Sequence, residues 1–363
     1  MRMMDQENAR AGRPVAPSLH AGIVAAVPES RAPETGPLDV PGVALSFAGI
    51  TLMVYSLIEA PTHGWLSAHT LGGAAIAAVL LALFVARQLR TATPILDVRL
   101  FRLPPFAMPA LAISVAYFSM FGYVFLTTQY FQGVRGYSAL EFGVATIPFA
   151  LALAVSAPLA TALAQRVGTM PVVVTGLILV SIGMVLAGQV DVDSSYVGLL
   201  LPTMVVLAVG IAVIQGPATE SIMSAVPVSE AGAGSAVNDT TRELGGTLGV
   251  AVLGSITASY YNAAVRPVVA EVPATVISDR DREYVDSSFL SVTALQEYDL
   301  PSILVPARDA LVLTMKEAAM DGARVASHVA AAAVAVCAVV VAVGLPRSHR
   351  TSGVLRADEA EEA

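Results

Sequence analysis

The sequence predicts an all-α polytopic membrane protein, and three observations support this fold class. Of the 363 residues, 55% are hydrophobic and only 13% are charged, whereas soluble domains carry about 25% charged residues. The mean hydropathy of +0.70 agrees with this composition. Uncharged stretches of at least 19 residues recur along the chain, and about 20 helical residues cross the roughly 30 Å hydrocarbon core of a bilayer.

Eight stretches contain no Asp, Glu, Lys or Arg. They are Val40–Ile58, Ala60–Ala86, Leu103–Val134, Phe142–Gln165, Val167–Val190, Ser194–Thr219, Leu244–Val265 and Val325–Pro346. Their residues lack the two-residue alternation of barrel strands. Because lipid offers no partner to an unpaired backbone amide, each stretch is expected to be a transmembrane helix.

The distribution of basic residues predicts that both termini lie in the cytoplasm. With eight crossings, one set of segments holds 13 arginines, and the short loops of the opposite set hold only Arg135. Six further basic residues surround a long outer loop, about 266–324, and long loops count little in the positive-inside rule. We expect a multi-pass cell-membrane protein with a disordered tail at 1–39, an acidic tail at 347–363 and an amphipathic helix at 307–323 in the loop.

Motifs of the common enzyme classes are missing from the sequence. It contains no GxxxxGK[ST] phosphate loop, no HExxH zinc motif and no GxSxG nucleophile elbow, and its five histidines are scattered. The sequence therefore predicts no enzyme, no cofactor, no metal site and no nucleic-acid partner. The lipid bilayer is the first expected partner.

One glycine-rich stretch, Val226–Tyr261, is expected to form a long helix that starts in the cytoplasm and enters the bilayer. Ser229 is a favourable N-cap, and residues 244–265 carry no charge. Glycines in a membrane helix let a neighbouring backbone come close. The glycines of this packing face are Gly245, Gly246, Gly249 and Gly254.

Polar residues within or beside the uncharged stretches are candidates for a substrate pathway, since polar side chains in membranes face a partner helix or a water-filled path. These candidates are Tyr123, Gln129, Gln215 and Asn238. Hydrogen bonding between helices is the alternative explanation for them. Glu141 follows Ser138 by three residues, which predicts a capping box.

Two further places are candidates for a gate. Glu220 follows Gly216-Pro217, where the helix is expected to kink or end, and it either pairs with Arg242 as an end charge or acts in gating. The stretch Ala157–Pro171 is a short turn rich in small residues that contains Arg166 and Gly168.

Four motifs together resemble one transporter family. They are PILDVRLFR at 94–102, QYFQGVRGYSAL at 129–140, PLATALAQRVG at 158–168 and VPVSEAGAGSAVNDTTRELGGTLGVAVLGS at 226–255. They are similar to motifs of the 14-helix drug:proton antiporters of the EmrB/QacA type, in the major facilitator superfamily. Gln165 stands where the superfamily's loop signature has Asp.

The resemblance implies that the eight stretches correspond to helices 7–14 of that fold. Residues 40–86 would be two linking helices and 103–346 a six-helix C-terminal bundle. The family exports amphipathic small molecules with protons as the coupling ion, and its N-terminal half carries the membrane-embedded acid. That half would be missing here, and the four glycines would form half of a packing seam without its other side.

Two alternatives to an active exporter remain open. The chain could be a non-transporting half-transporter that packs with another membrane bundle, or a truncated remnant of a disrupted gene. A membrane enzyme is disfavoured because no catalytic constellation is present.

Overall fold

A computed structural model describes residues 39–91, 94–226, 231–271, 285, 289, 291–293 and 305–344. In these ranges the regular secondary structure is entirely helical. Eight spans within the described ranges are long and apolar enough to cross a membrane: Val40–His63, Ala68–Gln88, Pro104–Val134, Ala139–Val167, Thr169–Ala187, Tyr196–Ser224, Gly234–Ala270 and Arg308–Gly344. Each overlaps one of the uncharged stretches, so the predicted fold class is confirmed.

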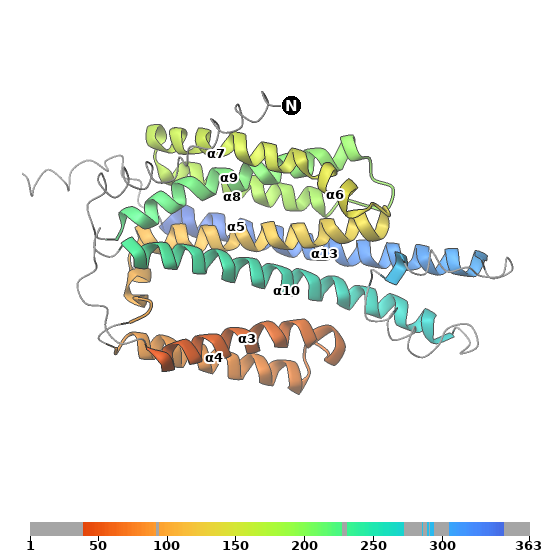
Figure 1. Cartoon of the computed structure of the whole chain (residues 1–363), viewed down its shortest axis with the longest axis horizontal. Helices are drawn as coiled ribbons and strands as arrows, with labels where there is room; N and C mark the ends of the chain where they lie inside the picture. The colour runs from red at the N-terminus through yellow and green to blue at the C-terminus, as the bar shows by residue number, and fades with distance from the viewer. Residues whose placement is uncertain are drawn as a thin grey trace, which may run out of the picture. The chain divides into compact units, whose positions relative to one another are not determined.

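The helical elements of the described ranges differ in type (Figure 1). In chain order they are α3 (Val40–His63), α4 (Ala68–Gln88), η1 (Val98–Arg102), α5 (Pro104–Gln129), η2 (Tyr130–Val134), α6 (Ala139–Ala145), α7 (Ile147–Val167), α8 (Thr169–Ala187), η3 (Tyr196–Leu200), α9 (Leu201–Ser224), α10 (Ala231–Glu271) and α13 (Val305–Gly344). The element η1 is a 3₁₀ helix, whereas η2 and η3 are π-helical turns.

Local sequence explains where several of these helices begin and end. The Ser67 hydroxyl accepts the backbone N–H of Thr70 at 3.1 Å and caps α4. Ser138 and Glu141 form the predicted capping box at the start of α6. Gly168 separates α7 from α8 with φ of 93°, a backbone conformation that favours glycine.

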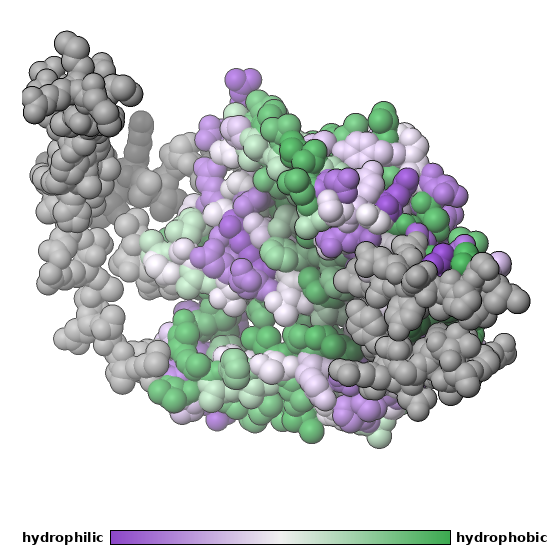
Figure 2. Space-filling view, turned by 45° about the vertical axis from the view of Figure 1, so that its right-hand side comes forward, coloured by the Kyte–Doolittle hydropathy of each residue, from purple (hydrophilic) through white to green (hydrophobic). Residues whose placement is uncertain are grey.

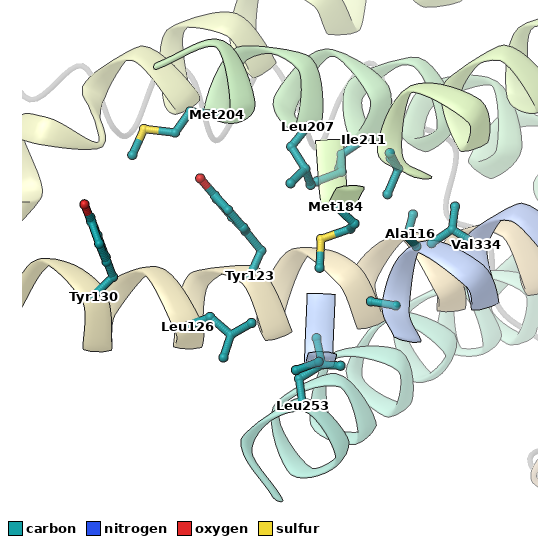
Figure 3. Close-up of a cluster of buried hydrophobic side chains, with 14 of the residues drawn as sticks. Ala116, Tyr123, Leu126, Tyr130, Met184, Met204, Leu207, Ile211, Leu253 and Val334 are labelled. Atoms are coloured by element: carbon teal, nitrogen blue, oxygen red, sulfur yellow. The ribbon is translucent and has the colours of Figure 1, made fainter. Parts of the chain in front are cut away.

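The hydrophobic core lies among α5, α8, α9, α10 and α13. Figure 3 shows part of it, where Met184 of α8, Leu207 and Ile211 of α9 and Leu253 of α10 surround α5. These four side chains are fully buried. Since every fully buried large side chain loses its contact with lipid as well as water, this core holds the bundle together by close packing.

The glycine-rich helix α10 packs tightly against α5. A methyl group on Gly245 would overlap the carbonyl oxygen of Ser114, and one on Gly249 would overlap that of Phe118. The Ser114 hydroxyl also donates to the carbonyl oxygen of Thr241 at 2.8 Å. Our expectation that the chain lacks the other side of this seam is wrong, because α5 supplies it. The two partners lie more than a hundred residues apart in the sequence, and no local pattern joins them.

Helices α3 and α4 form an antiparallel pair beside α10 (Figure 1). The Ser255 hydroxyl of α10 donates to the carbonyl oxygen of Leu57 at 2.6 Å, and the Trp65 indole donates to the hydroxyl of Ser259 at 2.9 Å. Most large apolar side chains of the pair are exposed, as the lower part of Figure 2 shows. Such a surface suits contact with lipid.

Two predicted boundaries differ from the structure. The outer loop 266–324 is partly helical, because α10 continues to Glu271 and α13 begins at Val305. The predicted amphipathic helix and the last membrane helix are therefore one helix. A charged residue marks the end of the part of a helix that lies in lipid, but the backbone hydrogen bonds of the helix can continue past it. The ion pair between Arg324 and Asp321 at 2.8 Å supports one further helical turn.

The boundary between the first two spans also differs. The second uncharged stretch begins at Ala60, whereas residues 60–63 belong to α3 and α4 starts at Ala68. Glu59 does not break the helix, because its carboxylate pairs with His63 one turn later at 3.3 Å. The turn comes at Gly64, with φ of 91°. The proposed N-cap Ser229, residues 1–38 and the tail 347–363 lie outside the described residues. Asp39, the last residue of the predicted disordered tail, is instead the N-cap of α3.

Candidate functional site

A small cavity lies among α5, α8, α10 and α13, next to the turn η2. Its volume is about 50 Å³, room for one or two water molecules. The wall is mostly apolar, and its polar side chains are Tyr123, Thr127, Gln129, Tyr130, Thr257 and Ser327. A drug-sized ligand needs a pocket of about 300–1,000 Å³, so this cavity is too small to hold one.

Two tyrosines on one side of α5 and η2 line the cavity. Tyr123, Thr127 and Tyr130 are spaced by four and three residues, which places them on the same helical face. Figure 3 shows the hydroxyl groups of Tyr123 and Tyr130 directed to the side of α5 that faces Met204 of α9. Both tyrosines are buried, and Tyr123 also stacks on Phe149 of α7 with 6.3 Å between ring centroids.

A hydrogen-bond network at this end of the bundle ties the cavity walls together. Arg135 donates to the Tyr130 hydroxyl at 2.8 Å and to the carbonyl oxygen of Ser194. The Tyr130 hydroxyl donates to the carbonyl oxygen of Asp191 at 3.4 Å, and Arg324 of α13 pairs with the Asp191 carboxylate at 3.7 Å. Opening the cavity between α5 and α13 therefore requires these bonds to break or move.

A second polar group, here named the Arg242 group, consists of Tyr117, Thr219, Asn238 and Arg242. The Arg242 guanidinium donates to the Thr219 hydroxyl at 2.9 Å and lies 5.3 Å from the centroid of the Tyr117 ring. Thr219 in turn donates to the Asn238 side-chain oxygen at 3.3 Å. The Nε of Arg242 is buried and has no hydrogen-bond partner. The group joins α5, α9 and α10 and retains one unused donor.

Glu220 does not take part in the Arg242 group. Its side chain is exposed, and the structure contains no ion pair between these two described residues. The expected pairing of Glu220 with Arg242 is therefore wrong. Successive helical residues point about 100° apart, so Thr219 faces Arg242 while the next residue faces away. Helix α9 also continues through Pro217 to Ser224, beyond the expected kink or end.

The remaining predicted residues lie in separate places. Tyr123 and Gln129 line the cavity, whereas Gln215 lies part-buried on α9 and does not line it. Arg166 is exposed in the last turn of α7, next to Gly168 in the turn before α8. The structure thus brings together Tyr123 with Gln129, and Asn238 with Arg242, but does not join these pairs into one site.

The cavity residues Tyr130, Thr257 and Ser327 were not predicted from the sequence. Hydroxyl side chains in helices commonly bond to the preceding turn, as Thr257 does to the Leu253 carbonyl oxygen at 2.9 Å, so they carry little signal alone. The spacing of Tyr123, Thr127 and Tyr130 was the available signal.

A buried carboxylate outside both polar groups joins the ends of α3 and α4. The Asp39 side chain is 2% exposed and accepts hydrogen bonds from Arg87 at 2.7 Å, Gln88 at 3.0 Å and the Gly42 backbone at 3.1 Å. The bond from Arg87, with those from Gly42 and Gln88, holds the pKa of Asp39 below its ordinary value against the opposing effect of burial. This contact clamps the base of the helix pair.

The described residues hold no cluster of metal ligands. None of their His, Cys, Asp and Glu side chains form a group of three or more that could hold a metal ion. The single cysteine, Cys337, is buried in α13.

Comparison with known proteins identifies a family that this chain matches. Residues 22–250 match the family described as Major Facilitator Superfamily. The multidrug efflux pump LfrA of Mycolicibacterium smegmatis is 33% identical over 324 residues, which are 88% of this chain and 61% of that protein. The multidrug resistance protein Stp of Mycobacterium tuberculosis is 31% identical over 319 residues, 87% of this chain and 58% of Stp.

A third relative gives the same coverage. The drug efflux pump JefA of Mycobacterium tuberculosis is 29% identical over 313 residues, which are 82% of this chain and 60% of JefA. The chain therefore spans 58–61% of the length of these three relatives.

Proposed function

Because the chain belongs to the Major Facilitator Superfamily, we propose that it is the C-terminal part of a 14-helix drug:proton antiporter that exports amphipathic small molecules. The observation that carries this proposal is its similarity to three proteins named for drug efflux or multidrug resistance, 29–33% identical over 82–88% of this chain. The eight membrane spans support it.

In this proposal, α3 and α4 are the two linking helices, and the helices from α5 to α13 form the C-terminal bundle. The packing supports this division, because α5, α8, α9, α10 and α13 share one core while α3 attaches the linking pair to α10. Both chain ends lie on the cytoplasmic side of the cell membrane, as the bias of 13 arginines to one predicts for short loops.

The substrate pathway runs past Tyr123 and Gln129, with Gln215 and Asn238 as further contacts. The small cavity is the closed form of this part of the pathway, and its apolar wall with a few polar side chains suits an amphipathic molecule. Glu220 and Arg242 are the gate residues, and the gate lies beside Tyr117, Thr219 and Asn238. Arg166 and Gly168 act in the turn between α7 and α8.

Proton coupling in this proposal requires a second membrane bundle. Ionisable residues that carry protons in membrane proteins face the interior of the bundle or a water-filled cavity. Among the described residues that line the cavity, none is Asp, Glu, His, Lys or Arg. Alternating access also needs two bundles that rock about a central site. The coupling acid therefore belongs to the partner bundle.

An efflux experiment tests this division of roles. A pump-deficient bacterium would express the chain alone or together with the N-terminal half of LfrA, and ethidium export would be followed by fluorescence. We expect export only from the pair, and its loss with a protonophore. Proton-dependent export by the 363-residue chain alone would show that coupling does not need the second bundle.

Cysteine accessibility tests the pathway separately. In a Cys337→Ser background, we expect Gln129→Cys in the co-expressed pair to react with a membrane-impermeant thiol reagent and to be protected by ethidium. Asp193→Cys is the matched control, since Asp193 is exposed in the loop between α8 and η3 and does not line the cavity. Equal protection of both positions would contradict the pathway.

The alternative is a half-transporter that packs with another bundle without coupling of its own. Large apolar side chains are exposed along α7, including Leu151, Val155 and Leu159, and would suit contact with a second bundle or with lipid. Crosslinking in membranes distinguishes the alternatives, because a chain without any bundle partner would exclude this one.

A further inference from the structure

The segment between α4 and α5 lies where two membrane spans meet the lipid headgroups. Helix α4 ends its span at Gln88 and α5 begins the next at Pro104. The short helix η1 lies between them (Figure 1). Because a helix that spans the hydrocarbon core leaves it near its ends, we expect the side chains between these two spans near the level of the phosphate groups.

Three arginines of this segment, here named the connector arginines, are Arg90, Arg99 and Arg102. All three are exposed, and in the described part of the chain none forms an ion pair with a carboxylate. Arg87 differs from them, because Asp39 neutralises it at 2.6 Å. Asp97, the acid within the segment, uses its carboxylate to accept the backbone N–H of Arg99 at 2.9 Å.

Three arginines at the other end of the bundle have partners. Arg135 binds Tyr130 and Ser194, Arg308 pairs with Asp309 at 2.9 Å, and Arg324 pairs with Asp321 at 2.8 Å. Arg166 at the end of α7 is also exposed and has no carboxylate partner among the described residues, but the connector arginines lie together in one short segment.

The backbone of η1 places two of these charges together. Side chains at positions i and i+3 of a 3₁₀ helix lie on the same side, so Arg99 and Arg102 form a pair. Arg99 is held further by a bond from its guanidinium to the Leu89 carbonyl oxygen at 2.8 Å. Leu96 and Leu100 pack against the core and fix the segment.

Exposed apolar side chains flank the connector arginines. Ile95, Phe101 and Leu103 are 45%, 40% and 47% exposed, and the ring of Phe101 meets that of Phe106 edge-on at 5.3 Å. Basic side chains beside apolar ones are the composition of segments that lie in the membrane interface. A soluble anion would use the arginines but would leave these three side chains in water.

We propose that the connector arginines, with Ile95, Phe101 and Leu103, bind the headgroup of an anionic phospholipid. Arg99 and Arg102 hold the phosphate together by charge-assisted hydrogen bonds, and the apolar side chains enter the adjacent acyl region. The bound lipid fixes the base of the α3–α4 pair relative to α5. This inference depends on the membrane location of the chain and not on its substrate.

Native mass spectrometry of the full chain in detergent tests the proposal, with titrations of phosphatidylglycerol and phosphatidylcholine. We expect Arg99→Gln/Arg102→Gln to bind phosphatidylglycerol about tenfold more weakly than the unchanged chain. The control Arg308→Gln/Arg324→Gln removes the same charge from the other end and should leave binding unchanged. Arg99→Lys/Arg102→Lys should retain part of the binding, because lysine keeps the charge and loses the bidentate geometry.

Three outcomes would overturn the proposal. They are equal phosphatidylglycerol binding by the Gln variant and the unchanged chain, equal retention of phosphatidylcholine, and displacement of the lipid by millimolar inorganic phosphate, which would indicate a simple phosphate site. If Arg99→Gln/Arg102→Gln does not fold, Arg90→Gln is the second variant, with an expected loss of about threefold. Unchanged binding by Arg90→Gln would then count against the proposal.

Discussion

Helix α10 is held in two different ways on its two sides. Toward α5, Gly245 and Gly249 bring the two backbones into contact, and no side chain separates them. Toward the α3–α4 pair, two hydroxyl hydrogen bonds at Ser255 and Ser259 add to the packing of α3 against α10. Backbone contact cannot shift without steric overlap, whereas a single hydrogen bond between membrane helices contributes only about 0.6 kcal/mol. We infer that α5 and α10 form one rigid body, to which the α3–α4 pair is attached weakly.

The largest expected effect comes from breaking the rigid contact with one methyl group. Gly249→Ala places a carbon atom on the carbonyl oxygen of Phe118, and overpacking that forces such shifts costs about 1–3 kcal/mol. We expect a lower midpoint of thermal unfolding in detergent. Gly72→Ala is the matched control, because nothing lies within 4 Å of the added methyl group. Equal midpoints for the two variants would show that the seam is not tight.

The second prediction concerns the Arg242 group, which links α9 to α5 and α10. Thr219→Val keeps the shape of the side chain but removes the acceptor of the Arg242 guanidinium, whose Nε already lacks a partner. Leaving a buried polar group unsatisfied costs about 1–3 kcal/mol. We expect this loss in unfolding free energy, measured in detergent. Thr175→Val, which breaks only a bond within its own helix, should cost much less.

The sequence predicted the membrane spans because the physical requirement is local. An apolar stretch of sufficient length must be helical in lipid wherever it lies, so composition alone located all eight spans. Helix ends depend on capping and on side-chain pairs. Glu59 and Arg324 therefore lie within helices, although the sequence predicted a boundary at each of them. The Ser138–Glu141 capping box was predictable because both partners lie within one turn.

The candidate site was less predictable because its contacts join distant segments. Thr219 and Arg242 meet across 23 positions, and Ser114 and Thr241 across 127. No pattern within one helix distinguishes a Thr that meets Arg242 from one that bonds to its own backbone. The same limit explains why α5 was not foreseen as the partner of the glycines.

The next prediction concerns Asp39, which holds the ends of α3 and α4 together. The pKa of Asp39 is lowered in the folded chain, so its carboxylate contributes stability at pH values above the ordinary aspartate pKa of 3.8. This contribution is lost as the pH falls through the lowered pKa. We expect the unchanged chain to unfold at a higher temperature than Asp39→Asn near neutral pH, and the difference to disappear in strong acid. A constant difference across the titration would contradict the clamp.

The smallest expected effect concerns the weak attachment itself. Trp65, in the turn between α3 and α4, is the single tryptophan of the chain, so its fluorescence reports on the contact between this turn and α10. Ser259→Ala removes the acceptor of the indole N–H and should shift the emission while costing about 0.6 kcal/mol. Adding Ser255→Ala should roughly double the cost, because the two bonds are separate. If this double variant lost as much stability as Gly249→Ala, the linking pair would belong to the same rigid body as α5 and α10, and the distinction between the two sides of α10 would fail.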